Sequence, residues 1–317
     1  MKINHEFDPR RNNYDKHTMD DESKAKLFFN KMKNPSWVFI FFTLLSLLLA
    51  WGPLSGLIAS TRYAEYYSHI LLIPIVSAYL IFRRRDKIFA DEQKINIFGL
   101  MIAAVGIGGY FWDIGIEKAA NQSDYIAVKT FSAWLFWVGG WIACYGMGNL
   151  RRAAFPVLFL LFVVPIPHLL MEEVIYLLQK GSAEAVDILF GIVGLTYARE
   201  GFVFQLPTVA IEVAKQCSGI RSTLALFITG VLASHLFLRR GWQQAVFIAA
   251  IFPITIIKNA IRILTLTLLG VHVDIHFLTD GFLHRSGGFV FFIPALLLAG
   301  CILFLLRKAD GTVSRKQ

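Results

Sequence analysis

The chain has 317 residues, of which 56% are hydrophobic and 17% are charged, and its mean hydropathy is +0.57. A soluble domain is typically about 45–50% apolar and about 25% charged, so this composition excludes an ordinary soluble enzyme and indicates a membrane protein. The net charge of +9 does not indicate a nucleic-acid partner, because Lys and Arg lie mainly between apolar runs, where they orient a membrane protein.

Uncharged runs long enough to cross a bilayer recur along the chain. A transmembrane helix needs about 20 mainly apolar residues, with a range of about 17–25. We therefore expect an all-α polytopic membrane protein with about eight transmembrane helices, in one catalytic domain over residues 35–308 between polar cytoplasmic tails at 1–34 and 309–317. The expected spans are Asn34–Thr61, Tyr66–Phe82, Ile95–Trp112, Phe131–Leu150, Ala153–Met171, Ser222–Leu238, Gly241–Gly270 and Ser286–Leu306.

The distribution of basic residues orients these spans. With both termini in the cytoplasm, 21 of the 31 Lys and Arg residues fall in cytoplasmic segments, eight fall outside, and two lie within a span. This is the bias of the positive-inside rule. It predicts a multi-pass protein of the plasma (inner) membrane with its remaining loops on the periplasmic or extracellular side.

Two features are expected on that outer side. In residues 172–201, four charged residues share one face of a helix at spacings of 7, 4 and 3, namely Glu173, Lys180, Glu184 and Asp187. This pattern indicates an amphipathic helix at the surface or over a polar cavity, with a tilted ninth span as the alternative. The segment Gly201–Val213 is rich in Phe and Val around Leu-Pro-Thr and predicts two short strands joined by a turn.

The hairpin-like segment leads to Cys217, which the spans place at the outer mouth of the sixth helix. A thiol that heads a helix is stabilised as thiolate by the helix dipole, and a neighbouring imidazole activates it further. Ser218 and Gly219 favour close approach of a substrate backbone. The alternative is a small buried structural cysteine, as we expect for Cys144 and Cys301, which lie inside uncharged runs.

Arg262 lies within the seventh span, roughly 12 Å below its outer end. Charged residues within a span are costly and usually mark function. Lys258 and Asn259 share its helical face. A permanently charged, multi-donor group can stabilise an oxyanion or hold a carboxylate; the alternative is a structural partner for Glu200, Glu212 or Asp280.

His284 opens the eighth span on the same outer side, so the topology brings a thiol, a guanidinium and an imidazole to one leaflet. The preceding loop carries His272, Asp274, His276 and Asp280, which leaves a metal-dependent hydrolase open as a rival interpretation. The loop has no His-Glu-x-x-His motif, and we expect neither a metal nor another cofactor. A transporter or channel with an anion path along Lys258, Asn259 and Arg262 is the other rival, although transporter sites are expected near the midplane between repeated halves.

Three short blocks in this order resemble the signature motifs of the exosortase/archaeosortase family. They are Cys-Ser-Gly-Ile-Arg-Ser at 217–222, Asn-Ala-Ile-Arg at 259–262, and His284 followed by Gly287, Gly288 and Phe289. Tyr-Ser-His at 67–69, Pro-Ile-Pro at 165–167 and Arg-Glu-Gly at 199–201 are also similar. The resemblance runs from about Trp37 to the end of the eighth span.

The resemblance implies a membrane cysteine transpeptidase. Cys217 would be the nucleophile, His284 the general base and acid, and Arg262 the stabiliser of charge, while Ser218, Gly219, Arg221 and Asn259 would contact the substrate. The implied substrates are exported proteins with a C-terminal signal made of a short, often Pro-Glu-Pro-like motif, a transmembrane helix and a basic end. Membrane lipid and an unidentified acceptor would be the other partners, with no nucleic acid.

Overall fold

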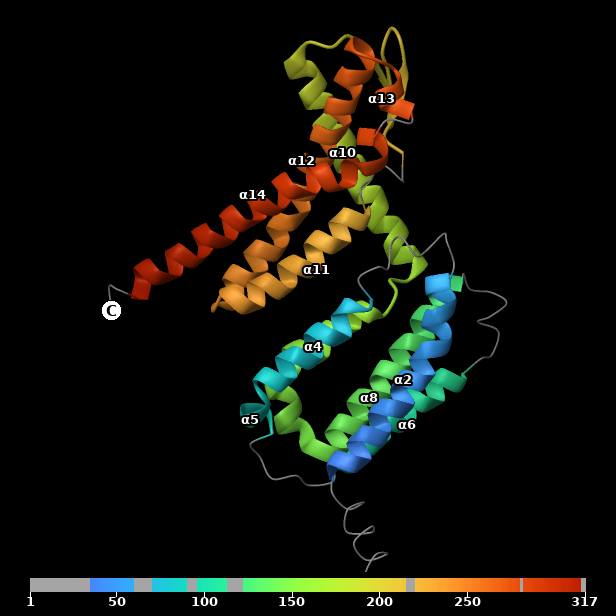
Figure 1. The fold of residues 1–317 in the computed structure, drawn as a ribbon, viewed down its shortest axis with the longest axis vertical. Coiled ribbons are helices and arrows are strands. Elements are labelled where there is room, and N and C mark those ends of the chain that lie inside the picture. Colours follow the sequence, from blue (N-terminus) through green and yellow to red (C-terminus); the bar gives the residue numbers. More distant parts are fainter. Residues whose placement is uncertain are drawn as a thin grey trace, which may run out of the picture. The chain divides into compact units, whose positions relative to one another are not determined.

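The computed structural model describes residues 35–59, 70–89, 96–112, 122–214, 220–279 and 282–314. The chain divides into two compact units, one formed by residues 1–60 and 70–165, the other by residues 61–69 and 166–317. Figure 1 shows their helices. Each unit is a helical assembly of its own.

The first unit is built around the long helix α8. Its elements are α2 (Pro35–Ala59), α4 (Leu72–Arg83), α5 (Arg85–Ile88), α6 (Ile97–Phe111), α8 (Gln122–Arg152), α9 (Ala154–Phe159) and the 3-10 helix η1 (Leu160–Val163). Trp141 and Ile142 of α8 lie at the centre of its core and are 1% and 2% exposed. Phe39 of α2 and Phe89 pack their rings against Trp141 at centroid distances of 5.3 and 5.5 Å. Aromatic contacts thus join α2 and the segment after α5 to α8.

Small residues bring α6 and α8 into close backbone contact. A Cβ added at Gly99 would lie 2.1 Å from the backbone nitrogen of Ala143, and one added at Gly139 would lie 2.3 Å from that of Ala103. No side chain fits in that space. This is the interface of small residues that membrane helices use, because packing rather than hydrophobic burial holds them together in lipid.

The second unit is built around α12 (Gly241–His272), which packs against α10 (His168–Val193), α11 (Ile220–Phe237), α13 (His276–Thr279) and α14 (Phe282–Ser314). Phe247, Ile251 and Ile254 of α12 pack with Leu226 of α11 and with Ala295 and Ala299 of α14. The amide of Gln243 donates to the carbonyl of Leu306 at 3.0 Å, so the start of α12 lies beside the last part of α14. Helices α12 and α14 therefore run antiparallel.

A three-stranded antiparallel sheet follows α10, in the order β1 (Ala198–Glu200), β2 (Val203–Gln205) and β3 (Ala210–Glu212). Strands β2 and β3 confirm the predicted hairpin before Cys217, and β1 is an additional strand. Gly201 turns the chain from β1 into β2 with a φ of +60°, which only glycine adopts readily. Phe204 of β2 is fully buried with Val186 and Phe190 of α10, so the sheet is fixed to that helix.

The predicted membrane class is confirmed, and the length of its spans can now be stated. Among the described residues, four helices are long and apolar enough to cross a membrane, and a fifth span results if α9, η1 and α10 form one broken span. The expected spans two, three and six are the shorter apolar helices Leu72–Arg83, Ile97–Phe111 and Ser222–Phe237. Within the described residues, each of the eight expected spans contains helical structure, but only four are full-length helices, because three are short and the fifth is broken.

The fifth expected span, Ala153–Met171, is not one helix. Helical structure ends at Val163 and begins again at His168, with Pro167 as the N-cap residue of α10. Pro165 and Pro167 cause the break, because proline has no N–H to donate and its ring clashes with the preceding turn. The amphipathic helix expected over 172–201 therefore starts earlier and ends at Val193, with Glu173, Lys180 and Glu184 exposed and Leu178, Ala183 and Phe190 buried.

Candidate functional site

A polar turn interrupts the apolar surface of α12. Lys258 is 7% exposed and Asn259 is 1% exposed, and Arg262, one turn further along, is half-buried. Buried polar and charged groups are costly unless they are paired or used for function. The ammonium of Lys258 donates a hydrogen bond to the hydroxyl of Ser222 in the first turn of α11. The start of α11 therefore lies at the level of the polar turn.

The neighbouring residue, Asn259, connects α12 to α10. Its side-chain nitrogen donates to the hydroxyl of Ser182 at 3.0 Å, and Ser182 is 1% exposed. Its side-chain oxygen is buried and has no hydrogen-bond partner among the residues that the structure describes. The side-chain oxygen of Asn259 can thus accept a hydrogen bond from a donor outside the described residues.

Gln179 makes a third contact in the same region. It lies one turn before Ser182 on the buried face of α10, and its amide donates to the carbonyl of Val213 at 2.6 Å. Val213 follows β3, is fully buried, and donates its own N–H to the carbonyl of Phe202 at 2.9 Å. The backbone that leaves the sheet is therefore held on both sides four residues before Cys217.

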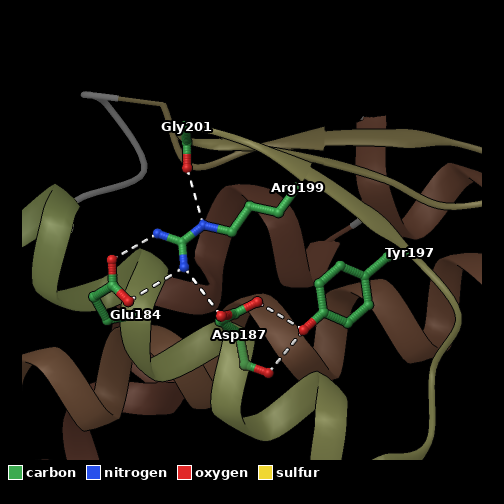
Figure 2. Close-up of polar contacts among 5 residues, drawn as sticks. All are labelled: Glu184, Asp187, Tyr197, Arg199 and Gly201. Carbon is green, nitrogen blue, oxygen red and sulfur yellow. Dashed lines mark hydrogen bonds and ion pairs between the residues drawn. The ribbon is translucent and has the colours of Figure 1, made fainter.

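Arg199 of β1 clamps the sheet to α10, as Figure 2 shows. Its guanidinium binds Glu184 through two hydrogen bonds of 2.7 and 3.2 Å, lies 3.1 Å from the Asp187 carboxylate, and donates from Nε to the carbonyl of Gly201 at 3.1 Å. The bond to Glu184 raises the pKa of Arg199. Tyr197 donates to the Asp187 carboxylate at 2.7 Å, which raises the pKa of the Tyr197 hydroxyl. Arg199 and Gly201 of the Arg-Glu-Gly block thus help to hold the sheet on α10.

The structure describes the predicted catalytic and substrate-binding residues to three different extents. Arg262 and Asn259 lie together on α12. His284 and Arg221 lie in the first turns of α14 and α11, where the structure gives the backbone. Cys217, Ser218 and Gly219 lie outside the described residues, immediately before the start of α11 at Ile220.

Among the described residues, the segment between α12 and α14 does not bring its histidines together. The His272 ring lies 3.1 Å from the carbonyl of Leu268, and the Asp274 carboxylate accepts from the backbone N–H of His276 at 2.9 Å. Over the ranges that the structure describes, no group of three or more His, Cys, Asp and Glu side chains could hold a metal ion. The side chains of Asp280 and His284 are not among those described.

Gln179 and Ser182 are functional candidates that the charge pattern of α10 did not reveal. The sequence contained one sign of them, since both are polar and lie three residues apart on the otherwise apolar face of an amphipathic helix. Their partners are 34 and 77 residues away in the chain, so spacing alone could not identify them.

Comparison with known families identifies the chain at the level of its family. The family described as transmembrane exosortase matches residues 59–301, which is more than two thirds of the 317 residues and includes Cys217, Arg262 and His284. No curated protein and no solved structure matches the chain significantly. The match agrees with the resemblance seen in the three motifs and with the multi-pass helical fold. The chain belongs to the transmembrane exosortase family.

Proposed function

We propose that this chain is a membrane-embedded cysteine transpeptidase that cleaves the C-terminal sorting signals of exported proteins at the outer face of the membrane. Cys217 is the nucleophile, His284 the general base and acid, and Arg262 the stabiliser of the oxyanion. The contact between Lys258 and Ser222 carries the proposal, because it fixes the first turn of α11 beside the α12 turn that leads to Arg262. Ser222 is five residues after Cys217.

The lengths of α12 and α14 support a position of His284 near the level of Arg262. Gln243 and Leu306 are hydrogen-bonded, so both can serve as a common starting level for α12 and α14. Arg262 lies 19 residues above that level on α12, or about 28 Å, and His284 lies 22 residues above it on α14, or about 33 Å. The two positions therefore differ in height by about one helical turn.

The length of α12 before the polar turn supports a site at the membrane boundary. From Gly241, which follows Arg239 and Arg240, to Lys258 is 17 residues, or about 26 Å of helix. The hydrocarbon layer is about 30 Å thick. If Arg239 and Arg240 lie on the cytoplasmic side of the inner membrane, the polar turn reaches the outer interface. That is where the recognition motif of a sorting signal leaves the lipid. A transporter site would be expected near the midplane instead.

In the proposed reaction, the Cys217 thiolate attacks the scissile carbonyl carbon, and the carbonyl electrons move onto oxygen. Arg262 stabilises that oxyanion through its charge and its several donors. Collapse of the intermediate breaks the C–N bond, and the leaving amine takes its proton from the His284 imidazolium. An acceptor nucleophile or water then gives a proton to His284 and attacks the thioester, which returns the thiolate.

Asn259, Ser218, Gly219 and Arg221 would hold the substrate. The buried side-chain oxygen of Asn259, which lacks a partner within the described part of the chain, supports this role because it can accept an N–H from a bound peptide. The basic end of the signal would remain in the cytoplasm, while its transmembrane helix lies in the lipid and the short motif reaches the site. The acceptor is a lipid, a glycan or water.

The test is the processing of a tagged exported protein with such a tripartite signal in membranes that contain Cys217→Ala. We expect processing to stop while the variant still inserts, because the covalent attacker is gone. Cys144→Ala and Cys301→Ala are the matched controls and should stay within a few-fold of the wild type. Continued processing by Cys217→Ala would refute the nucleophile, and loss of that activity on adding a chelator would favour a metal-dependent hydrolase.

A further inference from the structure

Four buried polar side chains of the second unit form a frame across two packed helices, made of Gln179 and Ser182 on α10 and Lys258 and Asn259 on α12. Ser182 and Asn259 are hydrogen-bonded to each other at 3.0 Å. Gln179 is one turn from Ser182, and Lys258 is the neighbour of Asn259. The frame therefore links two helices in the buried interior of the unit.

Each end of the frame binds a residue that flanks the same short segment of the chain. Gln179 binds the carbonyl of Val213, and Lys258 binds the hydroxyl of Ser222. The eight residues between Val213 and Ser222 include Cys217. Arg262 lies one turn beyond Lys258 on α12. The frame thus fixes both ends of the cysteine segment relative to the helix that carries the arginine.

We infer that Gln179 and Lys258 are positioning residues that set the distance between the Cys217 segment and Arg262. This inference rests on the proposed function. Covalent catalysis requires the attacking atom and the charge-stabilising group to be held in place, and a misplacement of about 1 Å can cost about 100-fold in rate. Neither residue is assigned a chemical step, so both act through the segment they hold.

A matched control exists at the opposite end of α12. Gln243 is also a buried glutamine whose amide donates to a backbone carbonyl, that of Leu306 at 3.0 Å. Its loss leaves the partly buried carbonyl of Leu306 without its donor, much as the loss of Gln179 leaves the buried carbonyl of Val213. Gln179→Met and Gln243→Met should therefore reduce stability by similar amounts, and only Gln179→Met should affect the site.

The experiment measures kcat and KM for signal processing in Gln179→Met, Lys258→Met and Gln243→Met, each normalised to folded protein in the membrane. The alkylation rate of Cys217 against pH is measured in parallel, with Cys144 and Cys301 replaced by Ala. We expect Gln179→Met and Lys258→Met to lower kcat about 10- to 100-fold with KM within about twofold. They should also change the alkylation profile, whereas Gln243→Met should leave kcat and the profile at wild-type values.

Two results would overturn the inference. One is a wild-type kcat in Gln179→Met and Lys258→Met. The other is a loss in both that matches Gln243→Met and leaves the alkylation profile unchanged, since that pattern marks a purely structural role. Processing that survives Cys217→Ala but not Ser222→Ala would instead refute the proposed function, because Ser222 and Lys258 would then act as a serine–lysine pair.

Discussion

Asn259 donates a hydrogen bond of 3.0 Å to Ser182, a residue 77 positions earlier in the chain, and both side chains are almost fully buried. In an apolar setting such a bond keeps two helices in one register, because any shift leaves polar groups unsatisfied. The register matters here since Arg262 lies one turn from Asn259 on α12. The long amphipathic helix α10 is thereby part of the support for the site.

Arg262→Lys should abolish processing while the protein still inserts. A compact ammonium carries the same charge but cannot present several donors in a plane to a developing oxyanion. We expect a fall in kcat of at least about 100-fold, the typical effect of losing one oxyanion donor. The measurement is turnover of the tagged substrate at saturating concentration, with Arg307→Lys, in the last part of α14, as a control. Near-normal turnover in Arg262→Lys would reduce its role to that of a general positive charge.

Gly139→Ala should destabilise the first unit. The added methyl would meet the backbone nitrogen of Ala103 at 2.3 Å, and backbone cannot move aside as a flexible side chain can. Overpacking of this kind costs about 1–3 kcal/mol or more. Gly108→Ala on α6 is the matched control, because nothing lies within 4 Å of its added methyl. Thermal inactivation in detergent should occur at a lower temperature in Gly139→Ala only; equal midpoints would contradict the close helix contact.

The Tyr197 hydroxyl should ionise at higher pH than an ordinary tyrosine. It donates to the Asp187 carboxylate, which favours the protonated form and raises its pKa. A folded-state pKa raised in this way stabilises the fold below the usual value of about 10, and that contribution is lost as the pH rises through the raised pKa. The measurement is the phenolate absorbance of the wild type minus that of Tyr197→Phe. Asp187→Asn should return the midpoint toward about 10, and an unchanged midpoint would argue against the bond.

The sequence was sufficient for the helices and for the hairpin before Cys217, because apolar runs and strand propensity are local signals. It did not predict the break between Val163 and His168, because Pro165 and Pro167 lie in an uncharged run that is long enough for one span and proline is tolerated in some membrane helices. Strand β1 was missed since its residues, Ala-Arg-Glu, form a strand only through pairing with β2. The partners of Gln179 and Ser182 depend on tertiary packing and have no local signature.

Labelling of Cys217 tests the topology and the chemistry together. If the distribution of basic residues gives the right orientation, a membrane-impermeant thiol reagent added to the outer face should modify Cys217. Cys144, which is buried in α8, and Cys301, which lies within the candidate span Val290–Ala309, should remain unlabelled. Labelling of Cys217 only from the cytoplasmic side would refute the orientation and, with it, the outer location of the site.

The same labelling reports on the Cys217–His284 pair when it is measured against pH. Pairing with an imidazole keeps part of the cysteine as thiolate below the free-thiol pKa of about 8.5. His284→Ala should therefore slow labelling at pH 7 and affect it much less near pH 9.5, where the thiol ionises unaided. A rate that His284→Ala leaves unchanged at both pH values would remove the pair and leave the orientation standing, because access of the reagent depends on topology and the rate at neutral pH depends on the thiolate.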